Sequence, residues 1–156
     1  VGVRVVAVFF FPVIRADQEK REKRFAGLLG GAPASIAALD RLPPAVLLTP
    51  IDLGAPLIFW THHSVVATPH HRNREAMADT LRIFIGDPAK AEALVRKQKA
   101  TLIVYCPAAN DFARYRRVSK ASLAARLYAG TPPGWLERVA LPGDSGLAVW
   151  RVKPAR

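Results

Sequence analysis

Apolar positions along the chain gather in short runs that are separated by prolines, glycines and polar turns. Short apolar runs bounded by turn residues are typical of buried strands. The sequence therefore predicts strands at residues 45–49, 64–68 and 101–106. The last of these lacks a polar alternation, as expected of a strand covered on both faces. Residues 136–141 and 146–152 predict an antiparallel hairpin around Pro142, Gly143 and Asp144.

Segments with helical periodicity or helix-capping residues lie between these strands. Residues 35–42 and 56–60 predict short helices, with a turn at 52–54. Asn73 is expected to cap a helix that ends at Ile85, and the predicted apolar stripe of this helix is Ala76, Met77, Leu81 and Phe84. Asp87 followed by Pro88 predicts a helix restart. Ser119 is expected to cap a helix over 119–129.

The alternation of strands and helices predicts an α/β fold with a small mixed, mostly parallel sheet flanked by helices and an antiparallel C-terminal hairpin. We expect three regions. They are a partial transmembrane helix at 1–15, a helical connector at 16–44 with a charged helix at 17–25, and a soluble α/β domain at 45–156.

The N-terminal assignment depends on length. Residues 1–14 are apolar apart from Arg4, and Pro12 interrupts them. A spanning helix needs about 20 apolar residues, so this run is interpreted as the end of a membrane helix that begins upstream. The alternative is a buried strand or helix of the soluble core.

Charge and composition leave two interpretations open. The net charge is +11. Such an excess of positive charge favours the binding of polyanions such as nucleic acid, anionic lipid headgroups or phosphate-bearing substrates. It also fits a solvated surface in an arginine-rich sequence. Tyr115 lies among Arg114, Arg116 and Arg117, yet one aromatic residue is too few to predict a nucleic-acid site. Cys106 is the single cysteine, which excludes an intramolecular disulfide.

The chain contains no nucleotide-binding fingerprint, no nucleophile elbow and no cysteine-rich zinc motif, so the sequence predicts no cofactor. Its four histidines form two pairs, His62–His63 and His70–His71, on either side of the strand predicted at 64–68. That strand spans about 13 Å, too far for the pairs to share one ion, and we therefore predict no metal.

The basic turn of His70, His71, Arg72 and Asn73 leads into a predicted helix. Donors at such a position can bind an anion or a sugar phosphate. The alternative is that Asn73 only caps the helix and that its neighbours are solvated.

Three segments resemble the C-terminal end of uncharacterised bacterial polytopic membrane proteins that are similar to GT-C glycosyltransferases. They are residues 46–54, 61–67 and 69–73. Their order also resembles the soluble domain of oligosaccharyltransferase catalytic subunits, over residues 45–106. Of the Trp-Trp-Asp-Tyr-Gly motif of that family, Asp52 and Gly54 match, whereas Pro50, Ile51 and Leu53 replace the aromatic residues.

The resemblance implies an accessory domain that helps to position an acceptor or a lipid-phosphate sugar and is not catalytic alone, since catalytic carboxylates of GT-C enzymes lie on loops between early membrane helices. The expected partners are the membrane and a lipid-linked sugar phosphate, on the periplasmic side of a bacterial inner membrane; nucleic acid is not expected. The contact residues implied are Asp52, His62, His70, His71, Arg72 and Asn73.

Two other functions remain open on the residues alone. The net charge of +11 also fits a stand-alone basic protein that binds polyanions. The histidine loops also fit a small metal-dependent enzyme.

Overall fold

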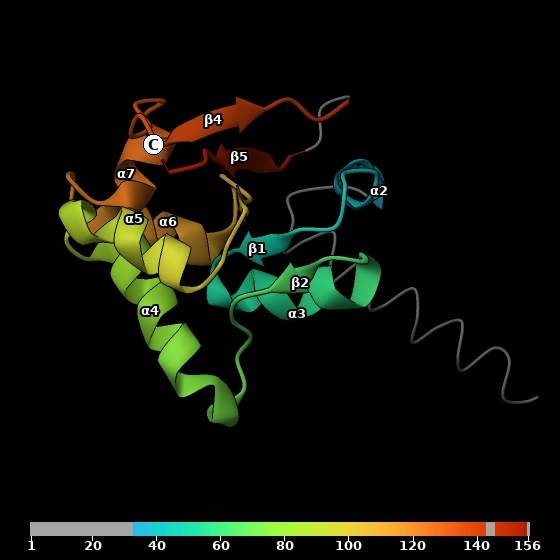
Figure 1. Ribbon diagram of the computed structural model, residues 1–156, viewed down its shortest axis with the longest axis horizontal. Helices are drawn as coiled ribbons and strands as arrows, with labels where there is room; N and C mark the ends of the chain where they lie inside the picture. Colours follow the sequence, from blue (N-terminus) through green and yellow to red (C-terminus); the bar gives the residue numbers. More distant parts are fainter. Residues whose placement is uncertain (1–32, 143–145, 156) are drawn as a thin grey trace, which may run out of the picture.

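The computed structural model describes residues 33–142 and 146–155. The predicted membrane-helix remnant at 1–15 and the charged helix at 17–25 lie outside these residues. Figure 1 shows helices packed around a twisted sheet. In chain order the elements are α2 (Pro33–Asp40), β1 (Val46–Leu48), α3 (Ile51–Trp60), β2 (Ser64–Val65), the 3-10 turn η1 (His71–Asn73), α4 (Arg74–Ile85), α5 (Pro88–Lys97), β3 (Leu102–Tyr105), α6 (Asn110–Val118), α7 (Leu123–Tyr128), β4 (Leu136–Val139) and β5 (Ala148–Val152).

The five strands form one mixed sheet in the order β2-β1-β3-β5-β4. β1 pairs in parallel with both β2 and β3, with Leu47 opposite Val65 and Leu102. β5 pairs antiparallel with β3 and with β4. The predicted α/β class, the parallel pairing and the C-terminal hairpin are confirmed. β2 is shorter than the predicted strand at 64–68.

Two hydrophobic clusters cover the two faces of the sheet. Successive residues of β3 point alternately into them, as pleating requires. Leu102 and Val104 join Ile36 and Leu39 of α2 and Leu53 and Leu57 of α3 in one cluster. Ile103 and Tyr105 join the residues of α4 to α7 in the other. Because both faces are covered, all four β3 residues are buried, which explains the absence of polar alternation.

Residues 52–54 form the first turn of α3, and the loop turn predicted there is wrong. Gly54 is needed because two segments of the chain approach each other closely there, and not because the backbone turns. A Cβ added to Gly54 would lie 2.1 Å from the backbone oxygen of Ala67, in the segment that follows β2. Gly54 therefore lets α3 pack directly on the chain that leads to His70 and His71.

Three further features of the helices also differ from the sequence-based expectation. Asn73 precedes α4, but its side chain makes no capping bond and instead donates from Nδ2 to the Val66 carbonyl at 3.4 Å. Ser122, and not Ser119, caps α7 by accepting from Ala125 N at 3.2 Å. α6 was not predicted. The predicted cap at Asp87 is confirmed, since Oδ1 accepts from Ala89 N at 3.0 Å.

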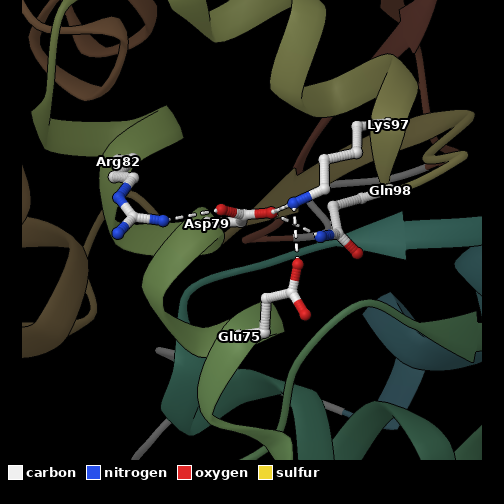
Figure 2. A network of polar contacts seen from close by, with 5 residues as sticks. All are labelled: Glu75, Asp79, Arg82, Lys97 and Gln98. Atoms are coloured by element: carbon white, nitrogen blue, oxygen red, sulfur yellow. Dashed lines mark hydrogen bonds and ion pairs between the residues drawn. The ribbon is translucent and has the colours of Figure 1, made fainter.

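The buried face of α4 also differs from the predicted stripe. Asp79, Thr80, Ile83 and Phe84 are buried, whereas Ala76, Met77 and Leu81 are partly exposed. Asp79 is accommodated by a polar network between α4 and α5 (Figure 2). Its carboxylate accepts from Arg82 at 3.0 Å, Lys97 at 2.8 Å and Gln98 at 2.7 Å. Lys97 also binds Glu75 at 2.9 Å. The hydrogen bond from Lys97, together with those from Gln98 and Arg82, keeps the pKa of Asp79 below its ordinary value, so the network stabilises the helical layer.

Within residues 33–142 and 146–155, no helix combines the length and apolar character needed to cross a membrane.

Candidate functional site

The parallel strands divide the polar candidates between two edges of the sheet. Asp52 follows β1 and the turn at His70–Asn73 follows β2, so both leave from the carboxyl edge. His62 precedes β2, which places it at the amino edge together with the end of α2. Ligands of open α/β sheets commonly bind outside the carboxyl ends of the parallel strands. The structure therefore groups five of the six predicted contact residues at one edge and separates His62 from them.

Asp52 and Asp111 form an acidic pair at the carboxyl edge. Asp52 is exposed in the first turn of α3, and Asp111 lies in the first turn of α6, the helix after β3. Burial raises the pKa of the Asp111 carboxyl, and the charge of Asp52 adds to this shift. A hydrogen bond from Phe112 N to Asp111 Oδ1, at 2.6 Å, acts in the opposite direction. The pair offers carboxylate oxygens to hydroxyl or amide donors of a ligand.

Tyr115 is a neighbour of this pair and not part of an exposed basic patch. Its ring packs against Phe84, with centroids 5.7 Å apart, as part of the core under α4. Burial raises the pKa of its hydroxyl, and the charges of Asp111 and Asp52 add to the effect. Arg116 instead stacks over Tyr128 at 3.9 Å. Arg116, one of the basic residues of α6, is therefore occupied in packing.

The turn after β2 presents basic donors at the same edge. His70, His71 and Arg72 are exposed. His70 Nδ1 accepts from Arg72 N at 3.3 Å, and Asn73 N donates to the His70 carbonyl at 2.9 Å, so the turn has a fixed backbone. In the part of the chain that the structure describes, no ion pair involves Arg72. Its guanidinium is therefore available to an anion.

Arg72 also borders an open pocket of about 410 Å³. The lining residues come from the turn, from α4 and from the end of α5: Arg72, Asn73, Glu75, Ala76, Lys97 and Gln98. Lys97 is already paired with Asp79 and Glu75. The cationic character of the pocket therefore depends mainly on Arg72.

A second pocket, of about 770 Å³, lies where β3 ends beside the hairpin. Aromatic side chains line it, including Tyr105, Tyr128 and Trp150, together with Arg138. Trp150 Nε1 donates to the Tyr105 hydroxyl at 3.3 Å, which fixes both rings. Arg138 lies 5.1 Å above the Trp150 ring. This pocket was not predicted, because its residues come from four segments with no shared sequence pattern.

The amino edge holds a different cluster. His62 N donates to Asp40 Oδ1 at 2.8 Å, and His62 Nδ1 lies 2.7 Å from the same oxygen. His63 is 5% exposed, and its Nε2 lies 2.9 Å from the Leu39 carbonyl. The hydrogen bonds from His62 keep the pKa of Asp40 below its ordinary value. Asp40 was missed because it is separated by 22 residues from His62.

Comparison with known proteins supports the fold. No protein-family model matches the chain, and no curated protein matches its sequence. Among solved structures, the chain is similar to the C-terminal globular domain of an oligosaccharyltransferase from Archaeoglobus fulgidus. The TM-score is 0.56 and the identity 14%, over 76% of this chain and 92% of that domain. The chain thus has the fold of an oligosaccharyltransferase C-terminal globular domain.

Proposed function

We propose that this chain is the accessory domain of a membrane-bound, GT-C-like glycosyltransferase and that it helps to position the acceptor or the lipid-phosphate sugar. The observation that carries the proposal is the similarity to an oligosaccharyltransferase globular domain over 92% of that domain. The resemblance of residues 45–106 to the same family, found from sequence, supports it independently of the fold. In this proposal the catalytic carboxylates lie outside this chain.

The carboxyl edge is the proposed contact surface. Arg72, His70 and His71 offer donors for phosphate oxygens, and a guanidinium can bind two of these oxygens at once. Asp52 beside Asp111 offers acceptors for sugar hydroxyls or acceptor amides. Donors and acceptors on one edge suit a ligand that carries both a phosphate and a sugar. His62 is not part of this surface, because it lies at the opposite edge.

We further propose that the complete protein places this domain on the periplasmic face of a bacterial inner membrane, with residues 1–15 as the end of a spanning helix. The reading frame upstream of Val1 tests this part. A frame that encodes several membrane helices would support it, and a start codon directly before Val1 would contradict it.

Vesicle co-sedimentation tests the contact surface. Phosphatidylcholine vesicles are compared with the same vesicles carrying either a polyprenyl phosphate or a polyprenyl-phosphate hexose. We expect the chain to sediment most with the hexose-bearing vesicles. Arg72→Ala should weaken this binding about tenfold, because a charge-assisted hydrogen bond is lost.

Lys90→Ala is the matched control, since Lys90 is an exposed cation at the start of α5, outside the proposed surface. Equal losses of vesicle binding in the two variants would mean that the chain binds by nonspecific electrostatic attraction, which would contradict the proposed surface. Equal sedimentation with all three kinds of vesicle would contradict the substrate class.

The net charge of +11 favours a second candidate function, a stand-alone polyanion-binding protein. A gel-shift series tests it, since such binding strengthens as salt is lowered. Absence of a shift at low salt would eliminate this alternative without affecting the first proposal.

A further inference from the structure

Three metal-ligating side chains converge at the amino edge of the sheet. One carboxylate oxygen of Asp40 and one ring nitrogen each of His62 and His63 lie within 4.8 Å of one another. They come from the end of α2 and from the two residues that precede β2. The His62 and His63 rings have centroids 4.3 Å apart and are inclined by 42°. None of these side chains belongs to the carboxyl-edge surface.

The hydrogen bonds of His63 determine which of its nitrogens can bind a ligand. A carbonyl oxygen only accepts, so the contact of Nε2 with Leu39 O requires the proton to be on Nε2. In the neutral ring, Nδ1 then carries a lone pair. Nδ1 is buried and has no hydrogen-bond partner among the described residues. His63 is thus oriented through one nitrogen by a backbone carbonyl, as metal-binding histidines commonly are, while its other nitrogen is unpaired.

We propose that Asp40, His62 and His63 bind one divalent transition-metal ion, with Zn²⁺ as the best match. Two imidazoles and a carboxylate are ligand types that Zn²⁺ accepts, and three protein ligands leave a fourth position for water. The site is independent of the proposed glycosyltransferase role.

The geometry lets the ligands close around an ion. Bonds of about 2.0–2.2 Å require ligand atoms closer together than 4.8 Å. His62 and Asp40 can make this adjustment, because each side chain is 42% exposed. His63 is held in place by burial and by Leu39. One fixed and two adjustable ligands thus form the site, and the ion replaces or extends the 2.7 Å contact of His62 with Asp40.

A bound ion would join the end of α2 to the start of β2. His62 and His63 already contact consecutive residues, Asp40 and Leu39, through hydrogen bonds. Coordination would add a link between the same two segments and would stabilise the folded state as the free ion concentration rises. The inferred effect of the ion is therefore to stabilise this junction of the fold.

The test uses the full chain, purified without a polyhistidine tag and treated with a chelator that is then removed. Calorimetric titration with ZnCl₂ and elemental analysis after gel filtration should give one ion per chain. The melting temperature should rise with added Zn²⁺. Absence of one-to-one binding would overturn the proposal.

Two variants test whether Asp40 and His62 are ligands of the ion. His62→Ala and Asp40→Asn, both at partly exposed positions, should each weaken Zn²⁺ binding at least tenfold, about the loss expected for an altered metal site. His71→Ala is the matched control and should bind as the unmodified chain does. Binding that survives both amino-edge variants, or that is lost in His71→Ala instead, would contradict the site.

Discussion

The two histidine pairs on either side of β2 look alike in sequence but differ in surroundings. Their ring centroids are 4.3 and 4.4 Å apart, and both pairs of rings are tilted. In the His62–His63 pair, His62 contacts Asp40 of α2 and the ring of His63 is buried. His70–His71 is exposed and lies in a turn with Arg72.

The difference shows that the chemistry of such a pair is set by what the fold brings beside it. A carboxylate and a buried lone pair make the amino-edge pair a candidate metal ligand set. A guanidinium and free donors make the carboxyl-edge turn a candidate phosphate contact. Four substitutions test this contrast.

Gly54→Ala should disturb the carboxyl edge most. Its Cβ would overlap the Ala67 backbone oxygen, and overpacking of this kind costs about 3 kcal/mol of unfolding free energy. Urea denaturation measures the loss. Gly134→Ala is the control, since nothing lies within 4 Å of its added Cβ. If folded Gly54→Ala protein keeps its Zn²⁺ binding, the two edges are independent; similar stabilities of the two variants would contradict the close approach.

His63→Ala should destabilise the fold more than His71→Ala. The first removes a buried ring and its bond to the Leu39 carbonyl, worth together about 2 kcal/mol of unfolding free energy, whereas the second removes an exposed ring. Thermal or urea unfolding without metal compares them. Equal stabilities would remove the structural distinction between the two histidine pairs.

Asp111→Asn should stabilise the protein at neutral pH. The raised pKa of Asp111 means that its ionised form is disfavoured in the folded state, so stability falls as pH rises through that pKa. The amide keeps an oxygen for Phe112 N and removes the charge beside Asp52. The advantage over the unmodified chain should disappear in acid. Urea midpoints across pH test this, and an advantage that is independent of pH would contradict it.

Asp40→Asn should have the smallest effect without metal, and with the opposite sign. The lowered pKa of Asp40 means that its ionised form is favoured in the folded state, so its contribution is present above the ordinary aspartate pKa and is lost as pH falls through the folded value. The variant should therefore be slightly less stable at neutral pH and equal in acid. Unfolding midpoints of the variant and the unmodified chain, measured at neutral and at acid pH, test this. A loss of stability that persists in acid would assign Asp40 another role.

Much of the fold could be predicted because local signals were strong. The apolar run at 101–106 became β3, and Asp87 with Pro88 began α5. The errors arose where one type of residue can have two different structural roles. Gly54 suggested a turn but permits close packing, and Ser119 lies three residues before the actual cap at Ser122. α6 was missed although Phe112 and Tyr115, spaced by three, face the core.

Less of the candidate sites could be predicted. Asp52 and the turn at His70–Asn73 were selected from sequence, and the structure places them at one edge of the sheet. Asp40, Asp111 and the aromatic pocket near Trp150 were not selected. Asp40 and Asp111 carry no motif, because an isolated aspartate before a turn or at a helix start has ordinary structural roles.

Local patterns were enough to specify the class of fold, the covered central strand, the hairpin and the two histidine pairs, because hydrophobic periodicity and turn chemistry act over a few residues. Which charged groups lie next to one another depends on the folded arrangement of the chain. Asp40 reaches His62 across 22 residues, and Asp52 lies close enough to Asp111 to shift its pKa. These neighbours depend on strand order and helix packing, which bring together residues that no local pattern links.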